Sequence, residues 1–447
     1  MIHYLKITNF GPIKDEVVLD FEVGEVGESE AYEVEMPDGR RLLKLGYIYG
    51  ANASGKTTVL KAFDFLRKLL LKPKSDKAFE LDFDPFFFRD SPYTIPSDFE
   101  LSFYVQDVRY IYNLKFNKQG VLHERIVYYQ TAKPTELFTR ITDPEKRLAK
   151  IDFGSRIRVP ARERDLLEAN TLHNNTVIGA YARTNVDIAE LEKLNLWFNQ
   201  YLLGMISASQ DLTHLTTSYF DHNPLIGKWI STFLHKADNQ ISKVNISDYD
   251  ISVPYEDPLL DLYPKVISQG SFPMETVVRS DKGTGKGELK YYGGGSIQRK
   301  IDFIHKLNNQ DYTLSIQSES NGTKRYFGLG GALYEIIHNP HMLCIDELET
   351  SLHPDLMKHF LQVFLLNSTN SQLLITTHNV SLLDNQDFIR KDALWFSEKN
   401  NEGAMNLYSA SDFDSSVLRK NASIINAYKV GKLGAKPNLG SPFLTEG

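Results

Sequence analysis

The sequence has only one cysteine, Cys344, among its 447 residues. A single cysteine excludes a disulfide within the chain, and its place in an apolar run indicates a small core residue. No uninterrupted apolar run approaches the roughly 18 residues of a membrane span, and the N-terminus lacks the pattern of a signal peptide. These absences predict a cytoplasmic protein with no membrane partner.

The sequence also lacks a net positive charge, an internal repeat and a low-complexity tract. Its formal net charge is −7, so a DNA contact would need a local basic patch rather than a global basic field. Charged residues make up 24% and hydrophobic residues 42% of the chain, as is usual for globular proteins. The length predicts two to three domains.

What the sequence does contain is a phosphate-binding motif, G-x-x-x-x-G-K-[ST], from Gly50 to Thr57. Leu45 to Tyr49 is predicted to be a buried strand, and an apolar stripe predicts a helix that ends by Pro73. In this context backbone N–H groups wrap a polyphosphate, Lys56 reaches the outer phosphates and the Thr57 hydroxyl ligates Mg²⁺. The alternative is a glycine-rich turn that binds nothing. The predicted nucleotide-binding residues of this loop are Gly50, Asn52, Ala53, Ser54, Gly55, Lys56, Thr57 and Thr58.

A second group of candidate residues follows two apolar strands late in the chain. The run from His341 to Ile345 ends in Asp346 and Glu347. Asp346 is predicted to hold the water shell of Mg²⁺, and Glu347 to polarise the attacking water. His378 follows the next strand and is a candidate sensor of the γ-phosphate. The alternatives are an acidic loop after a core strand and an ordinary surface histidine.

The rest of the chain predicts an antiparallel lobe followed by a mainly helical insertion. Residues 2–21 are expected to form a hairpin, and 99–105, 110–116 and 121–129 to form strands. Asp187 and Glu190 have the spacing of a capping box before an apolar helical stripe. A further helix is expected within 226–241, and a short one within 297–307. The glycines within 283–295 predict a hairpin tip, since that stretch lacks the spacing and the strand of a phosphate loop.

Four stretches of the sequence together resemble the ABC-type ATPase heads of the RecF/SMC group. They are Gly50 to Thr57, Ser320 to Arg325, Ile345 to Pro354 and Thr376 to His378. More narrowly, the chain is similar to the ATPases of overcoming-lysogenization-defect and abortive-infection (RloA/AbiLi/AriA-like) phage-defence systems. The opening at residues 5–14 and the tail at residues 427–437 carry that narrower likeness.

The resemblance implies an α/β fold: an ABC-type P-loop ATPase head, with a mixed sheet flanked by helices, an antiparallel lobe and the helical insertion. The expected parts are an N-terminal head part (1–134), the insertion (135–300) and a C-terminal head part (301–447). Ser320 and Gly322 would contact the γ-phosphate held by a partner head, so ATP and Mg²⁺ would join a homodimer or higher oligomer. The turn that contains Ser320 and Gly322 departs from the Leu-Ser-Gly-Gly-Gln sequence that is usual in such heads. These heads usually also have a glutamine that links the metal to the helical domain, and no glutamine of this sequence is assigned to that role.

Three functional hypotheses remain open at this point. The first is an ATPase that controls a separate nuclease or toxin in anti-phage defence, triggered by DNA or a phage protein. The second is a RecF/SMC-like, ATP-gated DNA-binding or repair protein. The third is a nuclease within the insertion, for which the histidines and acids show no recognisable metal spacing. The candidates for that third role are His173, Asp187, His214, Asp221 and His222.

Overall fold

The structure is a computed structural model, and the chain divides into two compact units that are described separately. The first unit is Met1–Gln210 with Glu335–Gly447, and the second is Asp211–Tyr334. The bounds of these two units differ from those of the three parts predicted from the sequence. The predicted division into two head parts and an insertion stays a prediction. The described residues are 1–24, 30–222, 224–253, 276–280, 289–292, 297–384, 389–413 and 423–436.

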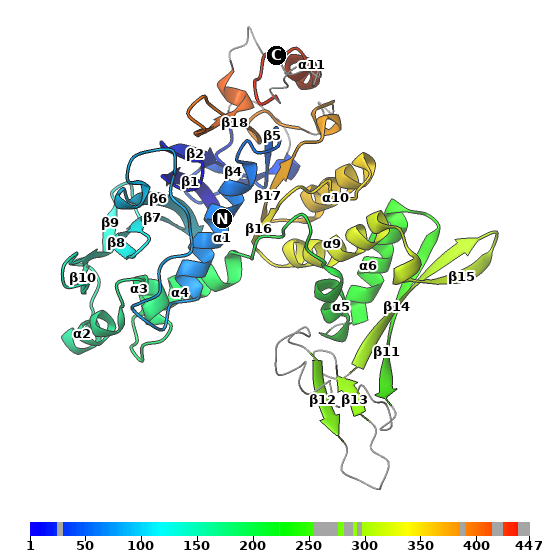
Figure 1. Cartoon of the computed structure of the whole chain (residues 1–447), viewed down its shortest axis with the longest axis horizontal. Helices are drawn as coiled ribbons and strands as arrows, with labels where there is room; N and C mark the ends of the chain where they lie inside the picture. The colour runs from blue at the N-terminus through cyan, green and yellow to red at the C-terminus, as the bar shows by residue number, and fades with distance from the viewer. Residues whose placement is uncertain are drawn as a thin grey trace, which may run out of the picture. The chain divides into compact units, whose positions relative to one another are not determined.

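The centre of the first unit is a mostly parallel sheet with the strand order β16-β17-β5-β18-β19. The pairs β16/β17, β17/β5 and β5/β18 are parallel, and β19 is antiparallel to β18. Every residue of β5, β16 and β17 is buried, as expected for strands covered on both faces. Figure 1 shows these strands side by side. Their bounds are β16 Met342–Ile345, β17 Gln372–Thr377, β5 Leu45–Gly50, β18 Leu394–Lys399 and β19 Met405–Ser409.

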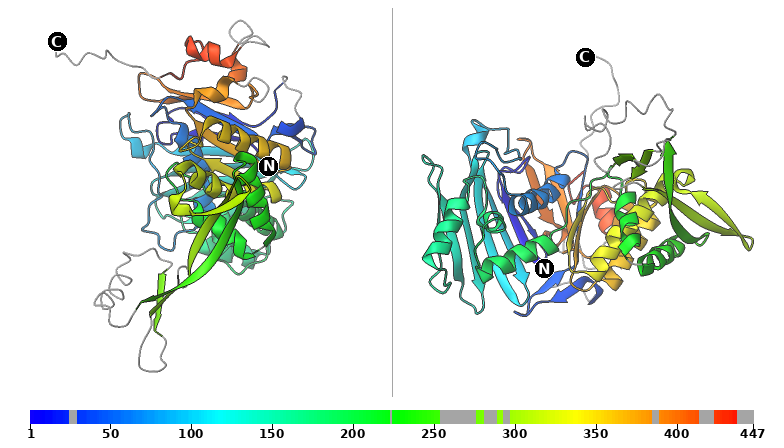
Figure 2. Two further views of the ribbon diagram at one scale, coloured as in Figure 1. Left: turned by 90° about the vertical axis from the view of Figure 1, so that its right-hand side faces the viewer. Right: turned by 90° about the horizontal axis from the view of Figure 1, so that it is seen from below.

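The helix predicted after the phosphate loop is confirmed as α1, Lys56–Leu71. One side of α1 packs against β5, β16 and β17, and its Phe65 stacks on Phe116 of the antiparallel sheet. Figure 2 shows α1 between the two sheets. The apolar stripe is therefore broad, because α1 is buried on two sides.

The second sheet of this unit is antiparallel and has the order β10-β9-β8-β7-β6-β1-β2. The predicted N-terminal hairpin and the three predicted strands are confirmed in it. The expectation of helix after residue 134 is wrong for 135–153, which adds two strands to this sheet. The strands are β1 Ile2–Thr8, β2 Val17–Asp20, β6 Ser97–Val105, β7 Val108–Asn117, β8 Gly120–Tyr129, β9 Thr135–Thr142 and β10 Ala149–Phe153, with a separate hairpin of β3 Glu33–Glu35 and β4 Arg41–Leu43.

Helices complete the first unit, and the predicted apolar stripe is confirmed on α4, where Leu191, Leu194 and Phe198 are buried. The predicted capping box is wrong, because Ile188 occupies the N-cap position and no side chain caps the helix. The remaining elements are α2 Ala161–Asn170, α3 Val177–Tyr181, α4 Ala189–Tyr201, α10 Pro354–Asn367 and α11 Ile424–Lys429, with 3₁₀ turns at Glu30–Tyr32, Pro92–Thr94, Val380–Asp384 and Ala410–Asp412.

The second unit combines helices with a sheet of order β12-β13-β11-β14-β15. The helix expected within 226–241 is confirmed as α6, but the one expected within 297–307 is wrong, because this stretch is β14. Its Ile301 and Phe303 are buried in alternation, which is the period of a strand. The predicted glycine-rich hairpin tip lies outside the described residues. The elements are α5 Thr213–His222, α6 Pro224–Ala237, β11 Ile241–Val253, β12 Thr276–Ser280, β13 Leu289–Tyr292, β14 Ile297–Leu307, β15 Gln310–Ser315, a 3₁₀ turn at Ile316–Ser318 and α9 Asn321–His338.

The glycines of α9 allow another helix to approach it closely. A Cβ at Gly331 would lie 2.7 Å from the Cα of Thr216 on α5, and one at Gly328 would lie 2.8 Å from the Cβ of Leu212. The Thr216 hydroxyl donates to the Gly328 carbonyl at 2.7 Å. Glycine lowers helix propensity, but here it permits the contact between α5 and α9. No helix among the described residues has the length and apolarity needed to cross a bilayer.

A buried carboxyl group in the antiparallel sheet makes the stability of the fold depend on pH. Glu124 is fully buried, and burial raises its pKa to about 7, against the partial opposition of Arg140. Between pH 4.5 and 7 the folded state therefore binds more protons than the unfolded state. This difference in proton binding stabilises the folded state by about 3 kcal/mol below pH 4.5. The stabilisation is lost as the pH rises through 7.

We expect Glu124→Gln to remove this pH dependence, because the amide does not titrate. The free energy of unfolding, measured by urea denaturation from pH 4.5 to 7.5, should fall less steeply in the variant than in the wild type. Its absolute value at pH 4.5 should stay close to that of the wild type, since the amide oxygen of the variant can still accept the bond from the Val177 N–H. Glu145→Gln, at an exposed turn, is the control. Parallel curves for the wild type and Glu124→Gln would contradict the assignment.

Candidate functional site

The loop between β5 and α1 has a backbone that only small residues permit. Gly55 has φ 105°, and a Cβ there would lie 2.7 Å from the Sδ of Met405. A Cβ at Gly50 would lie 2.4 Å from the carbonyl oxygen of Ser397 on β18. Ala53 also has a positive φ, of 61°. The fixed glycines of the motif are therefore required by close contacts and by backbone conformation.

Lys56, the first residue of α1, is buried beneath the loop. Its Nζ donates to the carbonyl oxygens of Gly50 and Ala51, at 2.9 Å each. Burial lowers the pKa of Lys56, while the nearby carboxylates of Glu347, Glu349 and Asp346 act in the opposite direction. The lysine is thus held at the loop by the backbone and by a field of acidic groups.

The structure brings the loop and the predicted metal-binding acid into contact. The Thr57 hydroxyl donates to the two carboxylate oxygens of Asp346 at 3.0 and 3.2 Å, although the residues are 289 positions apart. Asp346 follows β16, and the neighbouring β17 supplies Thr376, whose hydroxyl donates to Asp346 Oδ1 at 2.6 Å. The parallel strands end at one edge of the sheet, and this places all three side chains together.

These oxygen atoms fit a magnesium ion. Two neighbouring ligands of an octahedral Mg²⁺ lie about 2.9 Å apart, because Mg–O distances are about 2.0–2.1 Å. The Thr57 and Asp346 oxygens are 3.0 Å apart. Hydroxyl and carboxylate oxygens are also the hard ligands that Mg²⁺ prefers. The pair therefore suits the ion either directly or through its water shell.

Glu347 stands next to this pair in an unusual backbone conformation. Its φ is 45°, in the left-handed region that costs a non-glycine residue about 1 kcal/mol or more. Its backbone N–H donates to the Thr376 hydroxyl at 2.8 Å, which fixes the turn. The Glu347 carboxylate forms no ion pair with any residue that the structure describes. This acid is accordingly held in place through its main chain while its side chain stays available.

His378 follows β17 and is fixed by a nearby acid. Its Nδ1 lies 2.9 Å from Glu349 Oε1, and the same oxygen accepts from the His378 backbone N–H at 2.6 Å. The Tyr49 hydroxyl donates to the His378 carbonyl at 2.8 Å. The imidazole is half-exposed. Its other nitrogen is therefore available to a ligand at the carboxyl edge of the sheet.

The remaining residues of the predicted loop site differ in exposure. Asn52 and Ala53 are exposed, whereas the Ser54 hydroxyl is buried and has no hydrogen-bond partner among the described residues. Thr58 faces the turn at Gly11, where a Cβ would lie 3.1 Å from its Cγ2. The role of each residue in nucleotide binding stays a prediction.

Ser320 and Gly322 belong to the second unit, where they begin α9. The Ser320 hydroxyl accepts from the Thr323 backbone N–H at 3.0 Å and so caps the helix. The side chain of the preceding Glu319 is 7% exposed, and its carboxylate lies 2.6 Å from the imidazole of His305 on β14. The turn is thus tied to the sheet of its own unit, and its predicted contact with a partner's nucleotide stays a prediction.

Sequence reasoning missed two residues of the first unit that position predicted ones: Thr376 fixes Asp346 and Glu347, and Glu349 fixes His378. Both residues lie inside motifs that the sequence analysis named. The signal that could have identified them was a polar side chain in or next to a buried strand. In contrast, the nuclease candidates gain no support. Among the described residues one group could share a metal ion, and it consists of His3, Asp20 and Glu22.

Comparison with known proteins identifies a family. The model described as "AAA domain, putative AbiEii toxin, Type IV TA system" matches residues 47–384, well over half of the chain. A search of curated proteins found no match. The match includes the phosphate loop, both acids and His378.

Solved structures that resemble the chain include three heads of SMC proteins. One is an SMC head bound to the C-terminal winged-helix domain of ScpA (12% identity, 91% of this chain and 97% of that chain, TM-score 0.39). Another is the SMC head of Thermotoga maritima (12%, 91% and 98%, 0.38). A third is an SMC head with an extended coiled coil, bound to a ScpA domain derived from Pyrococcus furiosus (13%, 97% and 99%, 0.38).

These TM-scores are too low to carry an argument by themselves. The strand order of the central sheet and the juxtaposition of loop and acids instead support the expected α/β fold of an ABC-type P-loop ATPase head. The family match agrees with this architecture, since it spans the strands that carry both motifs. The chain therefore belongs to the AAA-domain family whose model covers residues 47–384.

Proposed function

We propose that the protein is a Mg²⁺-dependent ATPase that closes as a dimer around ATP and controls a separate effector in anti-phage defence. The observation that carries the ATPase part is the hydrogen bond between Thr57 and Asp346, at 3.0 Å. It joins a phosphate loop to an acidic strand end from a distant part of the chain. This is the arrangement that a metal-bound triphosphate requires.

Each side chain of the site has a role in this proposal. Lys56 and the loop N–H groups bind the outer phosphates, and Thr57 and Asp346 hold Mg²⁺, which neutralises charge on the phosphate oxygens when bound. Glu347 accepts a proton from the attacking water as general base. His378, oriented by Glu349, contacts the γ-phosphate and so distinguishes ATP from ADP.

The proposed dimer is based on the turn at the start of α9. The first N–H groups of a helix have no partner within it, and they favour an anion. We assign the Ser320 to Gly322 turn to the γ-phosphate bound by a partner head. ATP then stabilises the closed pair, and hydrolysis weakens it by removing that contact.

The effector is assigned to a separate protein, a nuclease or toxin. The family description itself refers to a putative toxin of a type IV toxin–antitoxin system, which supports a role in such systems. The trigger we propose is DNA or a phage protein. A genomic neighbourhood that encodes neither a nuclease nor a toxin would contradict the assignment of a separate effector.

The dimer is tested by measuring molar mass with light scattering during gel filtration. We expect the mass to double when the non-hydrolysed analogue ATPγS and Mg²⁺ are added. Ser320→Arg should prevent the doubling without weakening nucleotide binding, because the longer cation blocks the turn. Thr232→Arg, at an exposed position of α6, is the control.

A mass that does not change with nucleotide, or a Ser320→Arg variant that dimerises normally, would contradict the ATP-joined dimer. Duplex DNA binding is measured in parallel at several salt concentrations. Tight, nucleotide-dependent binding that weakens steeply with salt would favour the DNA-binding alternative over effector control.

A further inference from the structure

A large pocket lies at the other end of the strands that carry the acids and His378. Its volume is about 820 Å³, and all of its lining residues belong to the first unit, which resumes at Glu335 near the end of α9. Among them are His341, directly before β16, and Asn370, shortly before β17. Asp346 and His378 follow the carboxyl ends of the same two strands. The pocket is therefore separate from the proposed nucleotide site.

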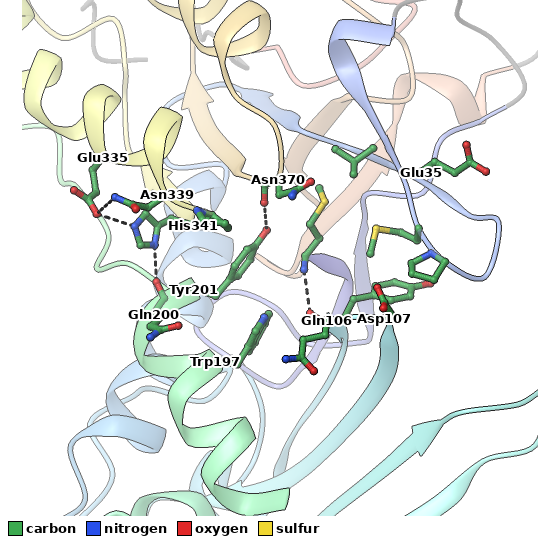
Figure 3. Close-up of a pocket in the computed structure, with 16 residues that line it drawn as sticks. Glu35, Gln106, Asp107, Trp197, Gln200, Tyr201, Glu335, Asn339, His341 and Asn370 are labelled. Carbon is green, nitrogen blue, oxygen red and sulfur yellow. Dashed lines mark hydrogen bonds and ion pairs between the residues drawn. The ribbon is translucent and has the colours of Figure 1, made fainter. Parts of the chain in front are cut away.

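Aromatic side chains contribute to the apolar lining of this pocket. Trp197 of α4 is stacked at 4.5 Å on Phe103 and at 4.8 Å on Tyr201. Figure 3 shows Trp197 standing between Gln200 and Gln106. Its indole N–H forms no hydrogen bond with any described residue, so it can donate to a ligand. The stacking fixes the indole, which lowers the entropy cost of using it as a contact surface.

The charged side chains that line the pocket are mainly acidic, and burial lowers the pKa of the Met1 amino group, which also lines it, to about 5. The described lining of the pocket includes three carboxylates, those of Glu35, Asp107 and Glu335, and no lysine or arginine. Glu335 is engaged by His341 at 2.8 Å, whereas Asp107 is exposed and forms no ion pair within the described chain. Asp107 and Gln106 form the tight turn between β6 and β7, which holds them at the pocket. The pocket thus offers an unpaired negative charge and an aromatic surface.

Primary amides complete the lining. Gln106, Gln200, Asn339 and Asn370 each carry both a donor and an acceptor group. Such groups match the alternating N–H and C=O groups of an extended peptide. A small charged ligand would pair with the carboxylate of Asp107, but it would leave most of these amides without a hydrogen-bond partner.

We propose that this pocket binds an extended segment of a partner polypeptide through a lysine or arginine side chain. The cationic head group pairs with Asp107, and the aliphatic stem lies against Trp197, as long basic side chains do on apolar surfaces. The amides of Gln106 and Gln200 bond the peptide backbone. The assignment rests on charge complementarity and does not depend on ATP hydrolysis.

The test begins with a random-peptide display library selected on the full-length protein. We expect the selected peptides to be enriched in lysine or arginine next to an apolar residue. One such peptide is synthesised, together with a copy in which citrulline or norleucine replaces the basic residue. The neutral copy should bind at least about tenfold more weakly, as loss of one charge-assisted bond predicts.

The position of binding is measured by ¹⁹F NMR of protein labelled with 5-fluorotryptophan. The chain has three tryptophans, so Trp229 and Trp395 serve as internal controls. The peptide should shift the resonance of Trp197 alone. Asp107→Lys should weaken the peptide at least about tenfold, whereas Glu145→Lys, the same charge change at a distant exposed turn, should change affinity by less than about twofold.

Four outcomes would overturn the proposal. They are a selection without enrichment of basic residues, a shift at a tryptophan other than Trp197, equal binding by Asp107→Lys, and binding of free agmatine as tight as that of the peptide. The last result would assign the pocket to a small organic cation instead. Thermal unfolding of Asp107→Lys confirms that the variant is folded before its affinity is compared.

Discussion

Glu347→Gln is expected to lower the rate of ATP hydrolysis at least about 100-fold while leaving ATP bound. A general base contributes about 10²- to 10⁴-fold to such reactions, and an amide cannot accept the proton of the attacking water. The substitution keeps the size of the side chain, and the backbone bond from the Glu347 N–H to Thr376 is unaffected. The loss should therefore appear in kcat, with little change in the affinity for ATP.

Steady-state phosphate release and equilibrium binding of a fluorescent ATP analogue separate the two quantities. Because hydrolysis releases the proposed dimer, Glu347→Gln should also accumulate as a dimer with ATP itself, without a non-hydrolysed analogue. Glu145→Gln is the matched control and should keep full activity. Retention of wild-type turnover by Glu347→Gln would remove Glu347 from the role of general base.

Lys56→Ala is expected to weaken ATP binding at least about 100-fold. A charged hydrogen bond contributes about 1.5–3 kcal/mol, and the lysine is assigned to two phosphates. The side chain is buried and already held at the loop by two carbonyl oxygens, so little of its freedom is lost when a nucleotide binds. Lys61→Ala, at an exposed position of the same helix, changes charge equally and is the control.

Isothermal titration with ATP and Mg²⁺ measures this effect, and thermal unfolding reports whether the loop still folds. Lys56→Ala should lose affinity even if its melting temperature is unchanged. Unchanged affinity in a folded variant would contradict the role of the loop as a phosphate cradle.

The contact between the loop and the acids could be expected from the sequence for a simple reason. Leu45 to Tyr49 and Met342 to Ile345 are both continuous apolar runs, which indicates strands buried on two faces of a parallel sheet. Parallel strands end at the same edge, so residues that follow them meet. The structure shows this for Thr57 and Asp346. Thr376 was not foreseen, because only the pairing of β16 with β17 places its hydroxyl at Asp346.

The antiparallel strands β9 and β10 and the strand β14 could not be predicted in the same way. In β14, Ile297, Ile301 and Ile304 recur at the spacing of a helix, which competes with the alternation around Ile301 and Phe303. In β9 the inward-facing Arg140 is completely buried, which breaks the usual polar-out pattern. Its guanidinium donates to the carbonyl oxygens of Leu172 and His173, a long-range arrangement that local sequence does not encode.

The most direct test of the site is the effect of Mg²⁺ on the affinity for ATP. Dissociation constants are measured with Mg²⁺ and with EDTA for the wild type, Thr57→Ala, Asp346→Asn and the exposed control Asp152→Asn. We predict that Mg²⁺ tightens binding at least about tenfold in the wild type and the control, and that both site variants lose this gain. If Mg²⁺ tightens binding equally in all four proteins, then Thr57 and Asp346 do not hold the metal and the proposed site is wrong.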